Sequence, residues 1–461
     1  MHTLKTLLFN LLFTPLAALH AADAKPDIVF IIADDLGWAD VAFHGGNAPT
    51  PNLDRLAREG VELTRHYVAP VCSPTRTGLM TGRCWSRFGV TTPVNERALP
   101  WDTITLPRAL KVAGYDTCLT GKWHLGSRPE EGPNHFGFDH SYGSLAGGVS
   151  PWNHRYKEGP YSVTWHRDET LIEEEGHVTD LIAAEAVKWI ESRGEAPFFL
   201  YVPFTAVHLP VKEPKEWVAR VPATITGEVA RHYAASVMHL DDAVGLLIAA
   251  LEKKGRRENT LVVFTSDNGG STTENNDSKY PDDHCPNGNL TGSNLPLRGQ
   301  KASVYEGGIR VPTMLSWPAK LKPGTFTMVA QITDWMPTLC ALAGAVPAHD
   351  LKWDGLNLWP PLSGEEPAKP RAIYTVGPGF NARAVRDGDW KLIVTGKNVA
   401  KKDTKPAGET SELYDLATDP NETTDLAARM PEKVAALRAR MDALARADRD
   451  ALPNRENDPP K

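Results

Sequence analysis

Near its N-terminus the chain reads Asp27-Ile28-Val29-Phe30-Ile31-Ile32-Ala33-Asp34-Asp35. The apolar run is continuous and rich in β-branched side chains, which is typical of a strand covered on both faces of a parallel sheet. Similar runs occur at residues 115–120, 198–202 and 260–265, and helical periodicity occurs at residues 52–59, 106–113, 178–193 and 229–254. Strands that alternate with helices predict an α/β/α sandwich around a large, mostly parallel sheet.

Polar residues follow each of these predicted strands. Because binding and catalytic residues of parallel sheets gather beyond the carboxyl ends of the strands, we expect these side chains to lie at one edge. In chain order they are Asp34 and Asp35, Lys122 and His124, His208, and Asp267 and Asn268.

The acids and the amide among these residues offer only hard oxygen ligands, which favours Ca²⁺ or Mg²⁺ over Zn²⁺. A single Asp-Asp or Asp-Asn pair after a strand is usually a cap or a turn. Two such pairs, Asp34-Asp35 and Asp267-Asn268, lie on strands of one predicted sheet and therefore predict a metal site.

A second motif reads Cys72-Ser73-Pro74-Thr75-Arg76 and continues to Gly82-Arg83. Proline is favoured in the first turn of a helix, so we expect Ser73 to cap a helix and Pro74 to be its first residue. Cys72 would then lie at the positive end of the helix dipole, with the Arg76 guanidinium over the same face. The motif predicts an anion site around one cysteine; the alternative is a structural cysteine beside a capped helix.

Composition limits the classes of partner. The chain has 461 residues and a net charge of −7, which gives no general affinity for nucleic acid or for anionic membranes. Residues 1–24 run from a basic region through an apolar one to small side chains, as in a secretory signal peptide; a buried N-terminal helix is the alternative. We expect no later membrane-spanning segment, and a protein that is periplasmic or secreted.

The pattern changes after residue 360. Short strand-like runs at residues 371–376, 382–385 and 390–394 precede an amphipathic stretch at Pro431–Ala445. This predicts a small antiparallel sheet with one helix. We therefore divide the chain into a signal peptide (1–24), a catalytic domain (25–360) and a C-terminal subdomain (361–461).

The motif around Cys72 resembles the signature of the sulfatases, formylglycine-dependent members of the alkaline phosphatase superfamily. In that signature a cysteine, followed two residues later by proline and four later by arginine, is oxidised to formylglycine. The resemblance covers nearly the whole mature chain and implies an alkaline-phosphatase-like fold and a sulfuric ester hydrolase. It also implies one Ca²⁺, with Mg²⁺ as a substitute, bound by Asp34, Asp35, Asp267, Asn268 and the modified Cys72.

The resemblance implies a catalytic role for six residues. In the family, a hydrated formylglycine attacks sulfur, Asp267 corresponds to the group that accepts its proton, and His208 corresponds to the acid that protonates the leaving alcohol. His124, in Gly121-Lys122-Trp123-His124, corresponds to the base that lets sulfate leave and restores the aldehyde. The full catalytic set implied in this way is Cys72, Arg76, Lys122, His124, His208 and Lys301.

Several segments look most like the arylsulfatase B, or N-acetylgalactosamine-4-sulfatase, branch of the family. This implies a sulfated galactose or N-acetylgalactosamine unit of a polysaccharide such as chondroitin, dermatan or carrageenan, and a formylglycine-generating enzyme as maturation partner. Residues 143–154, with Trp152 and His154, and the adjoining Arg155 are a candidate sugar-contacting loop; an ordinary packed loop is the alternative.

Two other functions remain open from the sequence. A phosphatase or phosphodiesterase of the same superfamily predicts more metal-binding histidines and leaves the Cys72 motif unexplained. An inactive exported glycan-binding relative predicts the loss of a catalytic residue, yet all are present. His239 and Asp242 have helical spacing, and we interpret them as a structural pair.

Overall fold

The computed structural model describes residues 25–275, 280–281, 283–396 and 408–455. The predicted signal peptide, residues 1–24, lies outside the described residues. Within these ranges the predicted helices and strands all occur, with ends within two residues of those expected.

A large mixed sheet forms the centre of the molecule. Its five middle strands run parallel, and antiparallel pairs occur only toward its two sides, in the described part of the chain. In spatial order the strands are β11 (Gly324–Phe326), β2 (Val61–Leu63), β10 (Met314–Ser316), β9 (Thr260–Ser266), β1 (Asp27–Ala33), β8 (Phe198–Pro203), β4 (Asp116–Lys122), β5 (His140–Ser144), β6 (Trp165–Arg167) and β7 (Thr170–Leu171).

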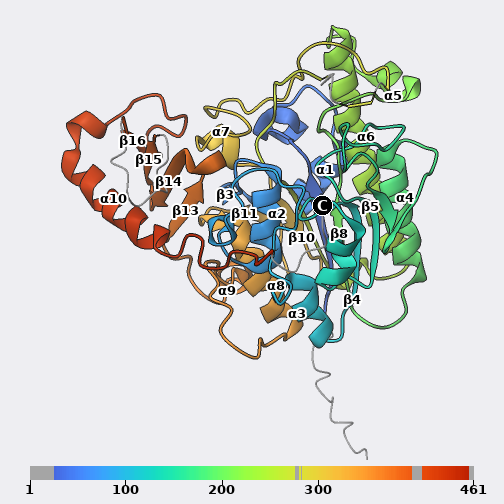
Figure 1. The fold of residues 1–461 in the computed structure, drawn as a ribbon, viewed down its shortest axis with the longest axis horizontal. Coiled ribbons are helices and arrows are strands. Elements are labelled where there is room, and N and C mark those ends of the chain that lie inside the picture. The colour runs from blue at the N-terminus through green and yellow to red at the C-terminus, as the bar shows by residue number, and fades with distance from the viewer. Residues whose placement is uncertain (1–24, 276–279, 282, 397–407, 456–461) are drawn as a thin grey trace, which may run out of the picture.

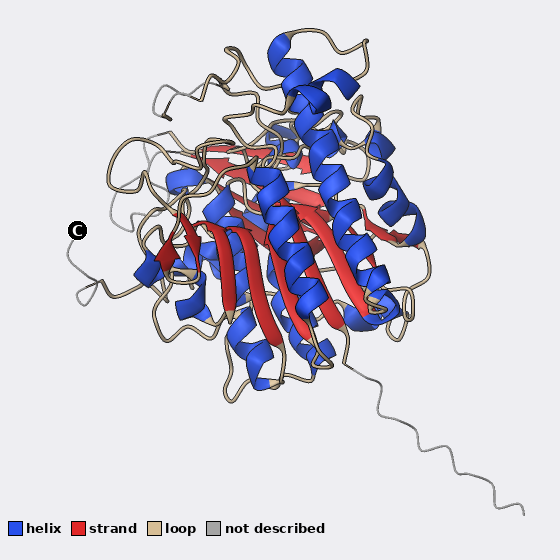
Figure 2. Ribbon diagram, turned by 90° about the vertical axis from the view of Figure 1, so that its right-hand side faces the viewer, coloured by secondary structure: helices blue, strands red, loops and turns tan. Residues whose placement is uncertain are grey.

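Helices cover both faces of this sheet. Side chains of β1 alternate: Ile28 and Phe30 belong to one hydrophobic cluster, and Val29 and Ile31 to another. Figure 2 shows helices crossing the sheet in front of its strands. The first cluster includes α2 (Cys72–Thr81), α3 (Leu106–Val112) and α8 (Trp335–Ala343); the second includes α1 (Pro51–Glu59), α4 (Val178–Ser192), α5 (Lys215–Arg220) and α6 (Glu228–Lys253). The predicted α/β/α sandwich is confirmed.

Shorter elements complete the domain. The three-residue strands β2, β10 and β11 are too short to show a sequence pattern. The antiparallel contacts of β10 with β2 and β9, and the parallel contact of β11 with β2, were not predicted. The remaining short elements are β3 (His66–Tyr67), β12 (Ala330–Gln331), α7 (Glu306–Ile309), α9 (Trp359–Ser363) and 3₁₀ helices at Trp38–Asp40, Ala42–His44, Trp85–Phe88, Pro129–Glu131, Pro133–Phe136, Arg257–Asn259, Ile332–Asp334, Pro378–Phe380 and Ala427–Arg429.

The C-terminal part of the chain forms a separate antiparallel sheet beside the main one, seen at the left of Figure 1. Helix α10 (Pro431–Ala445) packs on this sheet, as predicted. Its strands, in order, are β13 (Ala372–Val376), β14 (Ala382–Asp387), β15 (Trp390–Thr395) and β16 (Thr410–Asp415), of which β16 was not predicted.

A buried ion cluster joins this small sheet to the α/β/α sandwich. Lys391 of β15 lies with its Nζ 2.9 Å from Glu306 and 2.8 Å from Glu422. Tyr67 donates a hydrogen bond of 2.7 Å to Glu306, and Arg386 of β14 donates to the Tyr67 hydroxyl. The cluster therefore fixes α7, at the start of which Glu306 lies, against Tyr67, Lys391 and Glu422, which are 239, 85 and 116 positions away in sequence.

Replacing Lys391 by methionine should destabilise the fold strongly. The change removes the cation that two carboxylates share at sites with 1% or less side-chain exposure, and leaves Glu306 with Arg310 at 3.8 Å. Loss of one partner of a buried pair costs about 3–5 kcal/mol, measurable as a lower urea midpoint. Lys111→Met is the control, since its ion pair with Asp139 is exposed and such pairs contribute little. Equal midpoints for the two variants would contradict the prediction.

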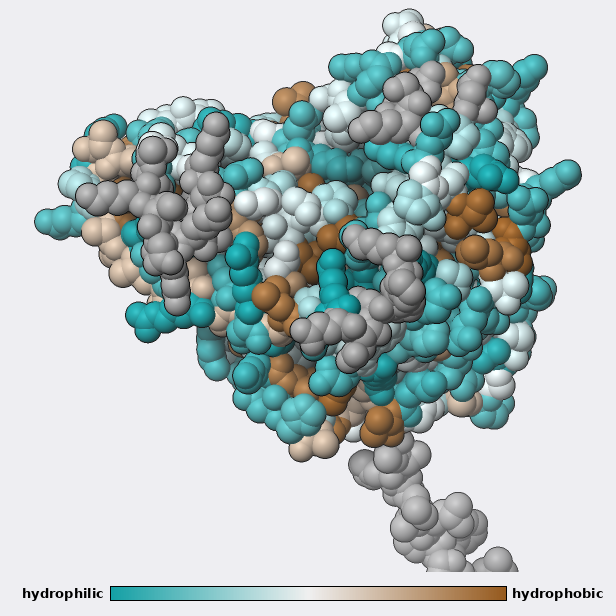
Figure 3. Space-filling view, in the orientation of Figure 1, coloured by the Kyte–Doolittle hydropathy of each residue, from teal (hydrophilic) through white to brown (hydrophobic). Residues whose placement is uncertain are grey.

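Helix α6 is the one described helix that is long and apolar enough, by length and composition, to cross a membrane. We expected no such segment after the N-terminal one. However, 78% of its most apolar window is buried in the structure, where α6 packs against α1, α4 and α5. Its apolar character therefore matches a core helix. The face of the protein in Figure 3 is largely hydrophilic, with apolar side chains scattered over it.

The proposed helical pair of His239 with Asp242 is wrong. His239 Nδ1 lies 2.7 Å from Glu213, and its Nε2 lies 2.9 Å from Asp180 of α4. The ring also stacks on Trp217 of α5, with centroids 4.5 Å apart. Two carboxylates from other segments thus take the place of the helical neighbour, and the residue joins three helical segments, in agreement with the structural role that we inferred.

His239 should make stability depend on pH. Burial lowers its pKa, but hydrogen bonds to Asp180 and Glu213 outweigh burial and raise the pKa to about 9; His177, stacked on the ring, is the other titratable group facing it. Since the unfolded pKa is about 6.5, the stabilisation is full below pH ~6.5 and is lost as pH rises through the folded pKa. We expect His239→Gln to cost about 2–3 kcal/mol more at pH 6 than at pH 9.5, measured by urea unfolding. A cost that is the same at both pH values would contradict this.

Candidate active site

The polar residues that follow the parallel strands do converge. Asp34 and Asp35 lie beyond β1, and the side chains after β9 reach them: Asp35 accepts a hydrogen bond of 2.7 Å from Asn268, and its backbone N–H donates to Asp267 (3.2 Å). Lys122, the last residue of β4, donates to Asp34. The expected meeting of these side chains at one edge of the sheet is therefore observed.

Four possible metal ligands lie close together there. Single ligand atoms of Asp34, Asp35, Cys72 and His208 all lie within 4.8 Å of one another. The buried oxygens Asp34 Oδ1 and Asn268 Oδ1 have no hydrogen-bond partner among the described residues. Buried polar atoms are nearly always paired, so two unpaired oxygens beside clustered carboxylates fit a hard divalent cation.

Cationic side chains surround these acids. Lys301 Nζ lies 2.7 Å from Asp35, and Arg76 Nη2 lies 2.9 Å from Asp267. Burial and the Asp267 charge raise the pKa of Asp34 to about 7. Burial also acts to raise the pKa of Asp35, but Lys301 and His208 lower it to about 2. Asp35 is therefore ionised at neutral pH and is available to a cation.

Helix α2 begins earlier than the sequence suggested. Its N-cap is Val71 rather than Ser73, and Cys72 and Pro74 both lie within its first turn. Ser73 does not cap the helix, because its Oγ accepts a hydrogen bond from the Val94 N–H of another segment (3.2 Å). Thr75 instead links the helix to the segment that follows β9, since its hydroxyl donates a hydrogen bond to the Asp267 carbonyl (2.6 Å). Cys72 thus remains at the positive end of the helix, as expected.

A pocket of about 570 Å³ opens onto this cluster, and Cys72 lies in its wall. His124, His208 and Lys301 line the same pocket. The backbone at Gly147 packs directly against the His124 ring, because a Cβ on Gly147 would lie only 2.4 Å from His124 Nε2.

Arg76 and Lys122 are not among the residues that line this pocket. They lie behind its wall with 1% and 0% exposure. Arg76 Nη1 donates to the Lys122 carbonyl (2.6 Å), so the two are joined. Arg76 pairs with Asp267, and Lys122 pairs with Asp34, so these two cations contact the buried acids behind the pocket wall.

The two pocket histidines are neutral at pH 7. Burial first, and then neighbouring cations, hold the pKa of His124 well below its usual value, and burial and Lys301 do the same for His208. Both ring nitrogens of His124 are buried without a hydrogen-bond partner among the described residues, so the ring can accept a proton. Burial also raises the pKa of the Cys72 thiol to about 12, so this thiol is a poor nucleophile as it stands.

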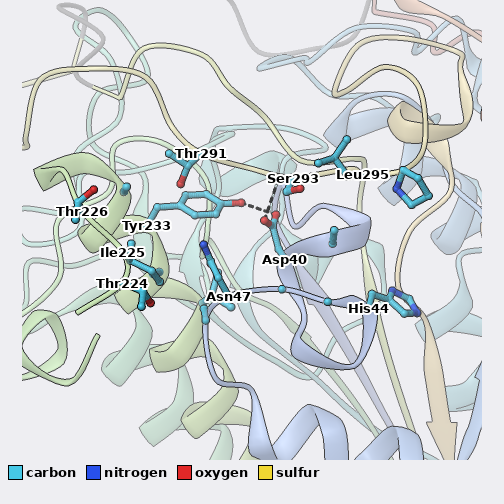
Figure 4. A pocket seen from close by; sticks show the side chains of 18 residues that line it. Asp40, His44, Asn47, Thr224, Ile225, Thr226, Tyr233, Thr291, Ser293 and Leu295 are labelled. Carbon is cyan, nitrogen blue, oxygen red and sulfur yellow. Dashed lines mark hydrogen bonds between the residues drawn. The ribbon is translucent and has the colours of Figure 1, made fainter. Parts of the chain in front are cut away.

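A second pocket of similar size is lined by residues 39, 40 and 44–48 and by parts of α6, and Figure 4 shows it. Its buried acid, Asp40, accepts hydrogen bonds from the Tyr233 hydroxyl (2.7 Å) and from the backbone N–H groups of Gly37 (2.7 Å) and Ser293 (2.9 Å). Asp40 thus joins three segments of the chain. The pocket that contains Cys72 is the candidate active site.

Comparison with known proteins identifies the family. The model of the sulfatase family matches residues 26–345. The chain belongs to the sulfatase family. It is accordingly a sulfuric ester hydrolase.

Named relatives agree with this assignment. Arylsulfatase J of Mus musculus is 31% identical, over 96% of this chain and 78% of that protein. N-acetylgalactosamine-6-sulfatase of Mus musculus is 32% identical, over 87% of this chain and 82% of that protein. Among solved structures, Ps i-CgsB in complex with k-i-k-neocarrahexaose is 30% identical with a TM-score of 0.80, and the match covers 93% of this chain and 95% of that chain.

Most of the loop that we expected to contact sugar, residues 143–154, does not line the candidate active-site pocket of this sulfatase. Of residues 143–154, Gly147 lines the pocket, whereas His154 stacks on Trp165 (4.6 Å) and the adjoining Arg155 pairs with Glu173 (3.0 Å). The pocket is lined instead by Tyr156 and Lys157, just beyond that loop, and by residues that sequence reasoning missed, Thr273, Glu274 and Tyr280. Their segments show no periodicity. Proximity to residues 143–154 was the available indication for Tyr156 and Lys157, and proximity to Asp267-Asn268 was the available indication for Thr273 and Glu274.

Proposed function

We propose that this sulfatase is exported to the periplasm or secreted after removal of residues 1–24, and that it hydrolyses sulfate esters of glycans. The proposed substrate is a sulfated galactose or N-acetylgalactosamine unit of a polysaccharide or oligosaccharide. In this proposal residues 25–360 form the catalytic domain and residues 361–461 form a C-terminal subdomain. The observation that carries the proposal is the convergence of Asp34, Asp35, Cys72 and His208 at the pocket whose wall Cys72 and His208 line.

One Ca²⁺ would be held by Asp34, Asp35, Asp267, Asn268 and residue 72. The two unpaired oxygens of Asp34 and Asn268 support this set. When bound, a divalent cation lowers the pKa of a coordinated hydroxyl and stabilises negative charge on sulfate oxygens. Mg²⁺ has the same ligand preference for oxygen and is the substitute cation.

Formylglycine derived from Cys72 would provide the nucleophile. A hydrated aldehyde carries two hydroxyls on one carbon, one to attack sulfur and one whose deprotonation expels sulfate. The high pKa of the unmodified thiol supports the need for such a change. A formylglycine-generating enzyme is the corresponding maturation partner.

Other side chains would bind sulfate and move protons. Lys301 faces the pocket and can contact a sulfate oxygen directly, while Lys122 and Arg76 add positive charge from behind the wall. His124 is neutral and can accept the proton of the second hydroxyl. Asp267, whose carboxylate pairs with the Arg76 guanidinium, would accept the proton of the attacking hydroxyl.

His208 would donate a proton to the leaving alcohol. Its pKa is low in the empty pocket because of burial and Lys301. A bound sulfate brings negative charge beside His208 and Lys301, which raises the pKa of His208 and favours its protonated form. His208 therefore takes up a proton from solvent when the substrate binds and passes it to the leaving alcohol.

The substrate class is supported by the relatives. The proteins similar to this chain include an N-acetylgalactosamine-6-sulfatase and a structure that holds k-i-k-neocarrahexaose. These names support an aminogalactose or galactose unit as the sulfated sugar. Tyr156 and Lys157 in the pocket wall are half-buried and adjoin the exposed residues 158–160, along which a glycan chain could extend.

Peptide mass analysis combined with a substrate screen tests the proposal. We expect the peptide containing residue 72 to carry the mass of formylglycine, and the purified protein to hydrolyse 4-nitrophenyl sulfate and at least one defined sulfated oligosaccharide. Turnover of phosphate esters alone would favour the phosphatase. An unmodified Cys72, with glycan binding and no hydrolysis, would favour a binding protein.

A further inference from the structure

Asn294 is a buried residue that has no part in the chemistry described above. Its side chain is 6% exposed, and it is not among the described residues that line the pocket of Cys72. Its amide makes two hydrogen bonds with one residue: the Gly270 N–H donates to Oδ1 (2.7 Å), and Nδ2 donates to the Gly270 carbonyl (3.1 Å). An amide side chain carries a donor and an acceptor, so it can pair with both backbone groups at once.

Gly270 lies next to two groups of the proposed site. It follows Asn268, a proposed cation ligand, by two residues, and its carbonyl also accepts a hydrogen bond from the backbone N–H of Lys301 (3.2 Å), the proposed sulfate-binding cation. The Gly269 N–H is bonded to the Gly308 carbonyl (3.0 Å), so this turn is held at two points. Fixing the Gly270 peptide groups therefore restrains both Asn268 and Lys301.

The Asn294 side chain also contacts the segment that follows β1. A Cβ built on Gly37, two residues after Asp35, would lie 2.9 Å from Asn294 Oδ1, so the amide packs directly on that backbone. The neighbouring Ser293 is fixed in the same place, because its N–H donates to Asp40 (2.9 Å), as Figure 4 shows. Asn294 thus lies between the two segments that carry the proposed oxygen ligands.

We propose that Asn294 is a positioning residue for the divalent cation. By joining Gly270 to Gly37, it holds Asn268 and Asp35 at the spacing that the cation requires. It acts through the backbone of these segments, since it does not line the pocket. The inference rests on the proposed function, to which the cation ligands belong. Hydrogen bonds outside the ligand shell commonly orient metal ligands, and their loss weakens metal binding by about 10- to 100-fold.

The test measures Ca²⁺ affinity directly. The purified protein is freed of metal with a chelator and titrated with Ca²⁺ by calorimetry. Asn294→Leu keeps a side chain of similar shape and removes both hydrogen bonds to Gly270, so the Kd for Ca²⁺ should rise about 10-fold. Asn294→Ser is a smaller change that also removes the amide, and it should raise the Kd in the same direction. It decides the question if Asn294→Leu does not fold.

Asn134→Leu is the matched control. The Asn134 amide also donates to a backbone carbonyl, that of Phe138 (3.3 Å), and accepts from the Ser141 hydroxyl (2.6 Å). Asn134 precedes β5, at the amino ends of the parallel strands and therefore at the edge of the sheet opposite the pocket. Its replacement should lower the urea midpoint and leave the Kd for Ca²⁺ unchanged.

Activity gives a second readout, which a general loss of stability would not change. Hydrolysis of 4-nitrophenyl sulfate by Asn294→Leu should fall furthest below that of the wild type at limiting Ca²⁺. The difference should shrink at saturating Ca²⁺, because occupancy of a weakened site is then restored. A difference that is the same at both Ca²⁺ concentrations would argue against a role in positioning the cation.

The outcomes separate this inference from the proposed function. If the wild type binds Ca²⁺ and both Asn294 variants bind it with the same Kd, the positioning role is overturned and the proposed function stands. An equal rise of the Kd in Asn294→Leu and Asn134→Leu would overturn it as well, since the effect would then be general. A wild type that binds neither Ca²⁺ nor Mg²⁺ would overturn the cation site of the proposed function itself.

Discussion

Cys72→Ser should lose turnover of sulfate esters by at least about 10³-fold, the scale seen when a catalytic nucleophile is removed. Serine places one hydroxyl in the pocket of Cys72, His124 and Lys301, so attack on sulfur remains possible. The sulfated serine cannot then expel its sulfate, because its carbon bears no second oxygen. We therefore expect a protein that accumulates one bound sulfate.

Mass analysis of the treated protein checks this expectation. Cys72→Ser incubated with 4-nitrophenyl sulfate should gain the mass of one sulfate on the peptide containing residue 72, and Cys72→Ala should not. Cys340→Ala is the matched control, since that thiol is equally buried but lies in α8 within the hydrophobic core. Wild-type turnover by Cys72→Ser would refute a nucleophile at this position.

Removal of the cation should have a comparable effect. Chelation should abolish sulfate ester hydrolysis, and added Ca²⁺ should restore it, because the proposed nucleophile depends on the divalent charge that Asp34, Asp35 and Asn268 would hold. Asp35→Asn should lower kcat by about 10²-fold or more, since it removes the acid whose low pKa keeps it ionised.

Thermal stability gives a second measurement that does not depend on activity. A cation that binds only the folded state stabilises it by about 2.7 kcal/mol at a concentration of 100 times its Kd, so Ca²⁺ should raise the Tm of the wild type. The rise should be absent from Asp35→Asn and present in Asp242→Asn, a control on α6 outside the pocket. A Tm that is insensitive to Ca²⁺ in the wild type would argue against the site.

The sequence predicted the architecture because its strongest patterns are local. The apolar run of β1 ends in Asp34-Asp35, and the same pattern of strand followed by polar residues recurs at β4, β8 and β9. Parallel pairing then brings these residues together whatever the loops do. For the same reason the positions of Asp267 and Asn268 beside Asp35 could be anticipated.

Interactions between distant segments could not be predicted in this way. His239 binds Glu213 and Asp180 rather than its helical neighbour, and the Ser73 hydroxyl accepts from Val94 rather than capping α2. In each case a partner from another part of the chain outcompetes the local one. The Tyr280 position in the pocket depends on how irregular loops fold, and irregular loops have no periodic pattern.

The buried ion cluster at Lys391 bears on how the chain matures. Lys301 lies five residues before Glu306 in the same segment. Its backbone N–H donates a hydrogen bond to the carbonyl of Gly270, which closely follows Asp267-Asn268 (3.2 Å). During synthesis this segment leaves the ribosome long before Lys391, which supplies the counter-ion for Glu306. We therefore expect the pocket to close late, after Lys391 has been translated, and a polypeptide that stops before Lys391 to lack a finished catalytic wall.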